Sequence, residues 1–272
     1  MSLTLNEFMR RLALEPAVLV SVSAAEGSVP RGPGTWMAVF AGTALGTIGG
    51  GRLEFEATHE ARSRLAAAAL KQVPAPQQVR FALGATLGQC CGGVVHLGFD
   101  RVTAADIPAL RARLREALAP VALFGGGHVG RALVNVLAAL PYAITWIDSR
   151  DEVFPDPVPA GVLCEHSDPV QVAVRTLAGG THVLIMSFSH AEDLDVVAAC
   201  LLRQRTQGDL RYIGLIGSKS KWAVFRKRLQ ERGFTQQELS LVTCPIGLAG
   251  ITGKEPEVIA VAVAAQLLCL RA

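Results

Sequence analysis

The stretch VALFGGGHVGRAL, residues 121–133, constrains the fold of this chain more than any other. Gly125, Gly127 and Gly130 follow an apolar run in G-x-G-x-x-G spacing and precede an amphipathic pattern. Such glycines allow a tight strand-to-helix turn whose backbone amides reach a phosphate at the helix N-terminus. Asp148 ends the next apolar segment, where an acidic side chain accepts hydrogen bonds from a ribose hydroxyl. The spacing predicts a nucleotide-type site, and the alternative is that the glycines serve packing alone.

Two regions of the chain follow different patterns. From residue 121 to 272, apolar runs alternate with amphipathic segments, which predicts an α/β, Rossmann-like domain with a doubly wound parallel sheet. Residues 1–104 contain short β-rich, glycine-punctuated segments and one helix over about 53–71, which predicts a small α+β domain with an antiparallel sheet. Residues 105–120 are read as a solvated helical linker with a charged face.

Composition excludes several function classes. No apolar run approaches the roughly 20 residues needed to span a bilayer, and the N-terminal residues lack the pattern of a secretory signal. The 26 basic and 23 acidic residues leave a net charge of +3, too small and too scattered for nucleic-acid binding. We therefore expect a cytoplasmic protein with no nucleic-acid or membrane partner.

Two of the 6 cysteines, Cys90 and Cys91, are adjacent in a glycine-flanked stretch. A disulfide between neighbours is strained and disfavoured in a reducing compartment, whereas soft sulfur ligands suit soft metals. The pair is therefore either functional or buried and inert, and the residues alone do not favour one reading. The remaining cysteines lie in apolar contexts and are expected to be core thiols. They are Cys164, Cys200, Cys244 and Cys269.

Further polar candidates follow later predicted strands. His190 comes after the fourth strand of the second region and is either an acid-base group or an exposed loop residue. Ser218 follows the fifth strand and is a candidate anion contact, whereas Lys221 and the basic residues after it are read as solvated. In the first region a triple glycine before a helix suits an anion, or only a flexible loop. This run is Gly49, Gly50 and Gly51.

Seven segments, in order, resemble the XdhC/CoxI family of xanthine dehydrogenase accessory proteins. They are GSVPRGPGTWM, GTIGGGRLE, LGQCCGG, LFGGGHVGRAL, WIDSRDEVFP, GLIGSKSKWAVFRKRL and CPIGLAGITGKEPEVIA. The resemblance covers nearly the whole chain and implies a non-catalytic chaperone for the molybdenum cofactor, which is molybdopterin carrying Mo. Such a chaperone holds this cargo while a cysteine desulfurase supplies a sulfido ligand, and then delivers it to the molybdenum subunit of apo-xanthine dehydrogenase.

The resemblance also implies which residues contact the cofactor. The matching positions are the loop residues Gln89, Cys90, Cys91 and Gly92, the run Gly49, Gly50 and Gly51, and the glycines Gly125, Gly127 and Gly130. We expect Cys90 or Cys91 to touch Mo or its labile sulfur, with the cofactor held between the two domains. Where many relatives have Thr-His-x-His, this chain has Ser187 to His190, and only the last histidine is retained. That departure puts an acid-base role for the loop in doubt.

Two other functions compete with this reading. In an NAD(P)-dependent oxidoreductase, Asp148 would hold the adenosine ribose and His190 would act on the substrate. In a protein-binding scaffold with a vestigial Rossmann domain, no small ligand would bind. A homodimer is compatible with the sequence, although no periodic pattern supports it.

Overall fold

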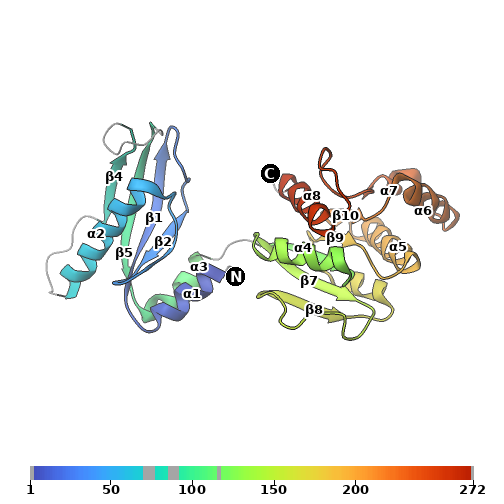
Figure 1. Ribbon diagram of the computed structural model, residues 1–272, viewed down its shortest axis with the longest axis horizontal. Coiled ribbons are helices and arrows are strands. Elements are labelled where there is room, and N and C mark those ends of the chain that lie inside the picture. The colour runs from blue at the N-terminus through green and yellow to red at the C-terminus, as the bar shows by residue number, and fades with distance from the viewer. Residues whose placement is uncertain (1–2, 70–76, 85–91, 115–117, 271–272) are drawn as a thin grey trace. The chain divides into compact units, whose positions relative to one another are not determined.

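The computed structural model describes residues 3–69, 77–84, 92–114 and 118–270. The chain divides into two compact units, Met1–Arg115 and Glu116–Ala272 (Figure 1). Within the described ranges, no helix has the length and apolar character needed to cross a membrane.

The first unit is a five-stranded antiparallel sheet in the order β3-β2-β1-β5-β4, as the β-rich pattern predicts. Its strands are β1 (Ala17–Glu26), β2 (Trp36–Val39), β3 (Ala44–Gly46), β4 (Gln78–Ala82) and β5 (Val94–Val102). Its helices are α1 (Leu3–Leu12), α2 (Gly51–Ala69), the 3-10 turn η1 (Ala104–Asp106) and α3 (Ile107–Arg113).

Both faces of this sheet are covered, because side chains along a strand point alternately to its two sides. On β1, Val18 and Val20 belong to the cluster that includes Leu53 of α2, whereas Leu19 belongs to the cluster of α1 and α3. Leu110 of α3 is only 3% exposed in that second cluster. The helix within 105–120 thus packs into the first unit and differs from the solvated connector that its charged face suggested.

The second unit is a six-stranded parallel sheet in the order β11-β10-β9-β6-β7-β8, which confirms the predicted Rossmann-like fold. Its strands are β6 (Ala119–Phe124), β7 (Tyr142–Asp148), β8 (Val162–His166), β9 (His182–Ile185), β10 (Tyr212–Leu215) and β11 (Val242–Thr243). Its helices are α4 (His128–Ala138), the 3-10 helix η2 (Val170–Thr176), α5 (His190–Thr206), α6 (Lys219–Glu231), α7 (Gln236–Leu239) and α8 (Pro256–Cys269).

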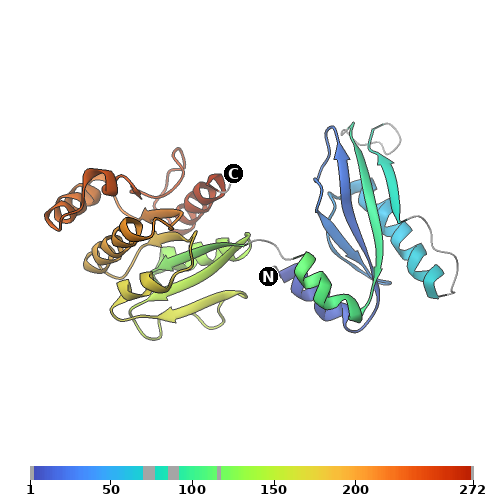
Figure 2. The same ribbon diagram turned by 180° about the vertical axis from the view of Figure 1, so that it is seen from behind.

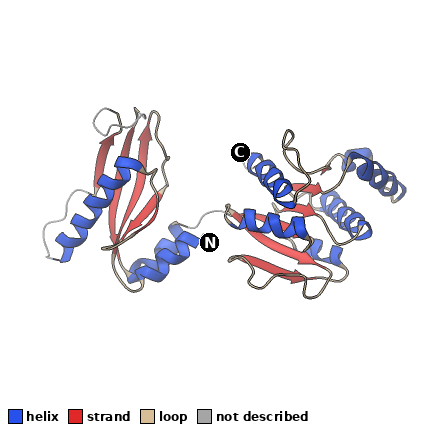
Figure 3. Ribbon diagram, viewed as in Figure 1, coloured by secondary structure: helices blue, strands red, loops and turns tan. Residues whose placement is uncertain are grey.

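Helices flank both faces of the parallel sheet, as the ribbon coloured by secondary structure shows (Figure 3). Leu123 and Trp146 pack with α4 and α8, whereas Phe124 and Ile147, their neighbours in sequence, pack with α5, α6 and η2 on the opposite face. Figure 2 shows the same ribbon from behind. The strands are therefore apolar on both sides, which explains their continuous apolar runs in the sequence. Polar residues end or follow several of these strands, among them Asp148 at the end of β7, Ser187 after β9 and Ser218 after β10.

Candidate ligand site at the carboxyl edge of the parallel sheet

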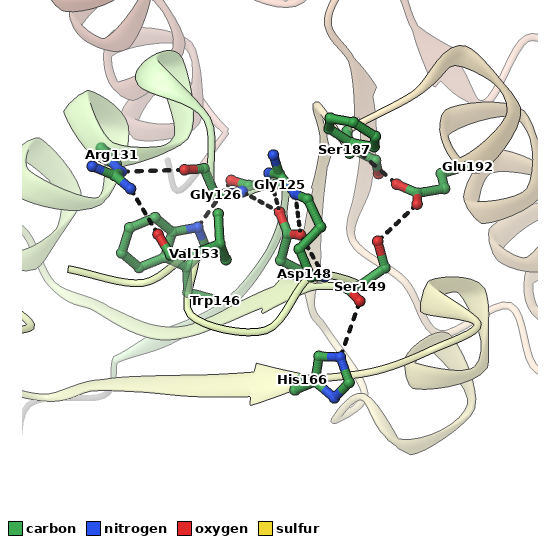
Figure 4. Close-up of polar contacts among 12 residues, drawn as sticks. Gly125, Gly126, Arg131, Trp146, Asp148, Ser149, Val153, His166, Ser187 and Glu192 are labelled. Carbon is green, nitrogen blue, oxygen red and sulfur yellow. Dashed lines mark hydrogen bonds and ion pairs between the residues drawn. The ribbon is translucent and has the colours of Figure 1, made fainter.

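The strand order reverses between β6 and β9. The chain runs from β6 through β7 to β8 on one side, and then returns to β9, β10 and β11 on the other. In doubly wound sheets, ligands bind at the carboxyl ends of the strands at this reversal. The segments that meet there are 125–127 after β6, 148–150 after β7 and 186–190 after β9 (Figure 4).

The glycines of the turn after β6 fall into two groups, those that close packing requires and one that has open space around it. A Cβ atom on Gly125, whose φ is +122°, would lie 2.0 Å from the carbonyl oxygen of Met186, and one on Gly130 would lie 2.1 Å from that of Gly125. Gly127 is exposed, and a Cβ there would meet nothing within 4 Å. It is also the N-cap of α4, which has no side-chain cap. Packing therefore requires Gly125 and Gly130, whereas Gly127 leaves the first amides of α4 accessible to a ligand.

Asp148 lies beside this turn, but both of its carboxylate oxygens are engaged within the protein. They accept four hydrogen bonds, one from the Gly126 amide at 2.6 Å and three from the backbone and guanidinium of Arg150 at 2.9 Å. Burial by itself raises the pKa of Asp148, but the hydrogen bonds from Arg150 and Gly126 outweigh it and hold the pKa below its usual value. The predicted ribose acceptor is thus occupied by the protein's own donors, and the sequence analysis missed Gly126.

Two contacts connect the loops after β7 and β9. The Ser149 hydroxyl donates to Glu192 at 2.7 Å (Figure 4), and the Arg150 guanidinium carbon lies 4.5 Å from the centroid of the Phe188 ring. Because β6 lies between β7 and β9 in the sheet, these contacts cross the carboxyl end of β6. A ring nitrogen of His166 also lies 3.0 Å from the carbonyl oxygen of Ser149, which fixes the loop further.

Lys221 is partly buried in an ion pair with a buried carboxylate, so the prediction that it is solvated was wrong. Its ammonium lies 2.6 Å from Asp193, and the two side chains are only 12% and 3% exposed. The ammonium also donates to the carbonyl of Ile216 at 2.8 Å, and the other oxygen of Asp193 accepts from the Ser187 amide. Lys221 lies in the first turn of α6 and contacts the first turn of α5. The sequence did not indicate this tertiary contact, because Lys221 lies among other basic residues typical of an exposed helix.

His190 and Ser218 lie at helix starts on the same edge. His190 is the first residue of α5, is exposed, and contacts Phe225 edge to face at a centroid distance of 6.2 Å. The cap of α5 is the neighbouring Ser189, whose hydroxyl accepts from the Glu192 amide. Ser218 caps α6, and its hydroxyl accepts from the amide of Lys221 at 3.1 Å. Ligand contacts by His190 and Ser218 stay predictions.

The triple glycine of the first unit is engaged with a carboxylate. One oxygen of Glu54 accepts hydrogen bonds from the amides of Ile48 and Gly50, at 3.1 and 3.0 Å. Gly49, Gly50 and Gly51 all have positive φ, as the turn into α2 requires. Because the Gly50 amide donates to Glu54 and the Gly49 amide donates to the Thr47 hydroxyl, this turn is less suited to a phosphate than the start of α4.

Gln89, Cys90 and Cys91 lie outside the described residues, so their predicted cofactor contacts remain predictions, and Gly92 is exposed just before β5. The prediction of four core thiols was correct for Cys200, which is buried, and wrong for Cys164 on the edge strand β8 and Cys269 in the last turn of α8, which are exposed. Cys244 is partly buried and packs against the core of the second unit. Burial raises the pKa of the Cys200 thiol to about 12. Among the residues that are described, no group of three or more His, Cys, Asp or Glu side chains could hold a metal ion.

Family models match both units of the chain. The XdhC Rossmann domain matches residues 121–267, and the XdhC and CoxI family matches residues 11–73.

One curated relative and one solved structure are similar over the full chain. The Escherichia coli (strain K12) protein YqeB is 24% identical over 97% of this chain and 46% of its own length. The chain therefore spans about half the length of that relative. A crystal structure described as a xanthine dehydrogenase from Bacillus halodurans is 20% identical with a TM-score of 0.77, covering 100% of this chain and 96% of that one. At this identity, the likeness shows a shared fold.

Proposed function

Because the chain belongs to the XdhC and CoxI family, we propose that it is a non-catalytic maturation factor for a xanthine dehydrogenase. In this role it binds molybdopterin carrying Mo as cargo, and holds it while a cysteine desulfurase supplies the sulfido ligand. It then delivers the cargo to the molybdenum subunit of the apo-enzyme. Such a carrier binds its cargo less tightly than the acceptor does, because a tighter complex would stall the transfer.

Apart from the family membership, the accessible start of α4 is the observation that supports this proposal most directly. Molybdopterin bears a phosphate, and Gly127 leaves the first-turn amides of α4 without a side-chain cap. Partial positive charge at a helix N-terminus and unpaired backbone donors together favour a phosphate. The strand reversal between β6 and β9 is also where a doubly wound sheet binds its ligand.

The geometry around Asp148 favours this function over the NAD(P)-dependent oxidoreductase. A dinucleotide enzyme of this fold uses the acid at the end of this strand to accept from the ribose hydroxyls. Here Gly126 and Arg150 already donate four hydrogen bonds to that carboxylate. A ribose could bind it only by displacing donors from a carboxylate that is 1% exposed.

The remaining parts of the proposal depend on Cys90 and Cys91. We propose that one of these thiols contacts Mo or its labile sulfur, because thiolates are suitable ligands for soft metals. Changing both to serine should lower the Mo bound to the purified protein while leaving bound pterin less affected. Equal Mo in the variant and the wild type, by elemental analysis, would remove the thiols from the proposal. The desulfurase and a homodimer stay proposals of the same kind.

The substitution Gly127→Asp tests the phosphate site. Asp is a favourable N-cap residue, so α4 should be stabilised or unchanged, while its carboxylate occupies and repels the phosphate position. Gly42→Asp is the matched control, because Gly42 is exposed and a Cβ there also meets nothing within 4 Å.

Each variant is purified from cells that make molybdopterin, and bound pterin is measured by fluorescence after oxidation. We expect Gly127→Asp to lose most of the pterin and Gly42→Asp to match the wild type. Freed of pterin, neither variant should have a lower thermal midpoint than the wild type. Wild-type pterin content in Gly127→Asp would contradict a phosphate at α4.

A further inference from the structure

Phe188 presents an aromatic ring to solvent next to the candidate phosphate site. Its side chain lies in the loop between β9 and α5 and the residue is 65% exposed. Single exposed apolar side chains are common on protein surfaces, so it is the location and the contacts of Phe188 that point to a ligand. Function in doubly wound sheets is located in these strand-end loops.

One face of the Phe188 ring is already covered by a cation. The Arg150 guanidinium carbon lies 4.5 Å from the ring centroid, within the range of a cation–π contact. Arg150 is itself held by Asp148, through Nε and Nη2 at 2.9 Å each. Since the residue remains 65% exposed with Arg150 on one face, the opposite face of the ring is open to a ligand.

The loop that carries Phe188 is fixed at its backbone as well. The Phe188 amide donates to one oxygen of Glu192 at 3.1 Å, and the other oxygen accepts from Ser149 at 2.7 Å. The ring is therefore pre-positioned, and a ligand that stacks on it loses little further side-chain entropy from the protein.

The ring, a polar hydroxyl and the glycine turn lie on adjacent strand ends. β6 and β9 are direct parallel neighbours, and the Met186 amide donates to the carbonyl of Phe124 at 2.8 Å. Ser187, just before Phe188, has a buried hydroxyl oxygen for which the described part of the chain supplies no hydrogen-bond partner. A buried hydroxyl without a partner is unfavourable unless a ligand or water completes it.

We propose that Phe188 is a stacking platform for the flat heterocyclic ring of a phosphorylated ligand whose phosphate binds at the start of α4. This inference rests on the proposed function, under which the ring is a pterin. It assigns ligand recognition to the loop after β9 through Phe188, which the sequence analysis did not select as a site residue.

The test compares wild type, Phe188→Ala and Phe188→Tyr in direct binding titrations. The main probe is the fluorescent oxidised pterin phosphate obtained from molybdopterin, and ribose 5-phosphate is the probe that has a phosphate but no flat ring. Loss of one aromatic stack should weaken binding of the pterin phosphate roughly 5- to 150-fold in Phe188→Ala. Phe188→Tyr should retain the wild-type affinity, and ribose 5-phosphate should bind all three proteins equally.

The outcomes separate this inference from the proposed function. If Phe188→Ala binds the pterin phosphate as wild type does while Gly127→Asp does not, the platform is overturned and the phosphate site stands. If the wild type binds adenosine monophosphate in a Phe188-dependent way but no pterin, the platform is supported and the pterin cargo is overturned. If Phe188→Ala weakened the binding of ribose 5-phosphate as much as that of the pterin phosphate, the substitution would have disturbed the loop in general, and the stacking platform would be overturned.

Discussion

The carboxylate of Asp148 accepts a 2.6 Å hydrogen bond from the amide of Gly126, 22 residues earlier in the chain. The contact ties the end of β7 to the turn after β6. It also explains the middle glycine of the run, because a Cβ on Gly126 would lie 2.7 Å from the Val153 side chain and 3.3 Å from Asp148. An acid at this position can thus stabilise the glycine turn after β6 instead of contacting a ribose.

Asp148→Asn should destabilise the second unit. The amide would place an NH₂ group among donors from Gly126 and Arg150, leaving at least one of them unpaired in a site that is 1% exposed. We expect a loss of roughly 2–3 kcal/mol in the free energy of unfolding, measured by urea denaturation. A loss below about 0.5 kcal/mol would contradict this role, because it is the size expected for a surface substitution.

Acid should destabilise the protein through carboxylates whose pKa is depressed by folding. Although burial raises the pKa of Asp148, hydrogen bonds hold it below its ordinary value. Hydrogen bonds donated by the Arg205 guanidinium and by the Thr235 amide lower the pKa of Glu238 to about 2. A depressed folded pKa gives stability that is present above the unfolded pKa of about 4 and lost as the pH falls through the folded value. The urea concentration at the unfolding midpoint should therefore decrease as the pH is lowered from 5 to 2, and this decrease should be smaller in Asp148→Asn. Identical slopes would exclude Asp148 from this effect.

Serine substitutions should have different effects on the free energy of unfolding at the three glycines of the turn. At Gly125 and Gly130, a Cβ would approach a carbonyl oxygen to 2.0 and 2.1 Å, so serine there should lower the free energy of unfolding by more than about 2 kcal/mol. Gly127→Ser should change it by less than about 0.5 kcal/mol, since serine is a good N-cap residue and the position is open. Thermal midpoints of the three variants check this order. Equal effects at all three positions would mean that Gly127 is also required for packing.

A double-mutant cycle should measure a coupling between Lys221 and Asp193. Because the pair is 12% and 3% exposed, Lys221→Met leaves a buried carboxylate uncompensated and should cost roughly 3 kcal/mol of unfolding free energy. Adding Asp193→Asn should recover part of that loss. The exposed pair Arg232 and Asp195, 46% and 41% exposed at 2.7 Å, is the matched control and should couple by less than about 1 kcal/mol. A coupling no larger than that of the control would show that burial adds nothing.

The fold could be predicted from the sequence wherever a local pattern carried the information. The glycine spacing at 125–130 placed a turn between β6 and α4, and alternating apolar runs predicted the parallel sheet. The antiparallel sheet of the first unit followed from short strands separated by glycine. In each case neighbouring residues determine the element, because strand and helix periodicities are properties of short segments.

Contacts between distant segments could not be predicted in this way. The burial of Lys221 depends on Asp193, 28 residues away, and the packing of α3 depends on α1 across the first unit. Phe188 is an ordinary apolar residue in the sequence, and only its 65% exposure beside Arg150 makes it a candidate. The extra glycine at 126 was the one visible sign of the Asp148 contact, because the G-x-G-x-x-G pattern does not require it.

The amount of Mo and pterin bound to the wild-type protein purified from cells that make molybdopterin tests the central claim most directly. Elemental analysis and oxidation to fluorescent pterin should find both in comparable amounts, and the purified complex should activate an apo-xanthine dehydrogenase that lacks the cofactor. Neither Mo nor pterin above the level of an unrelated protein purified from the same cells would contradict the claim that this chain carries the molybdenum cofactor.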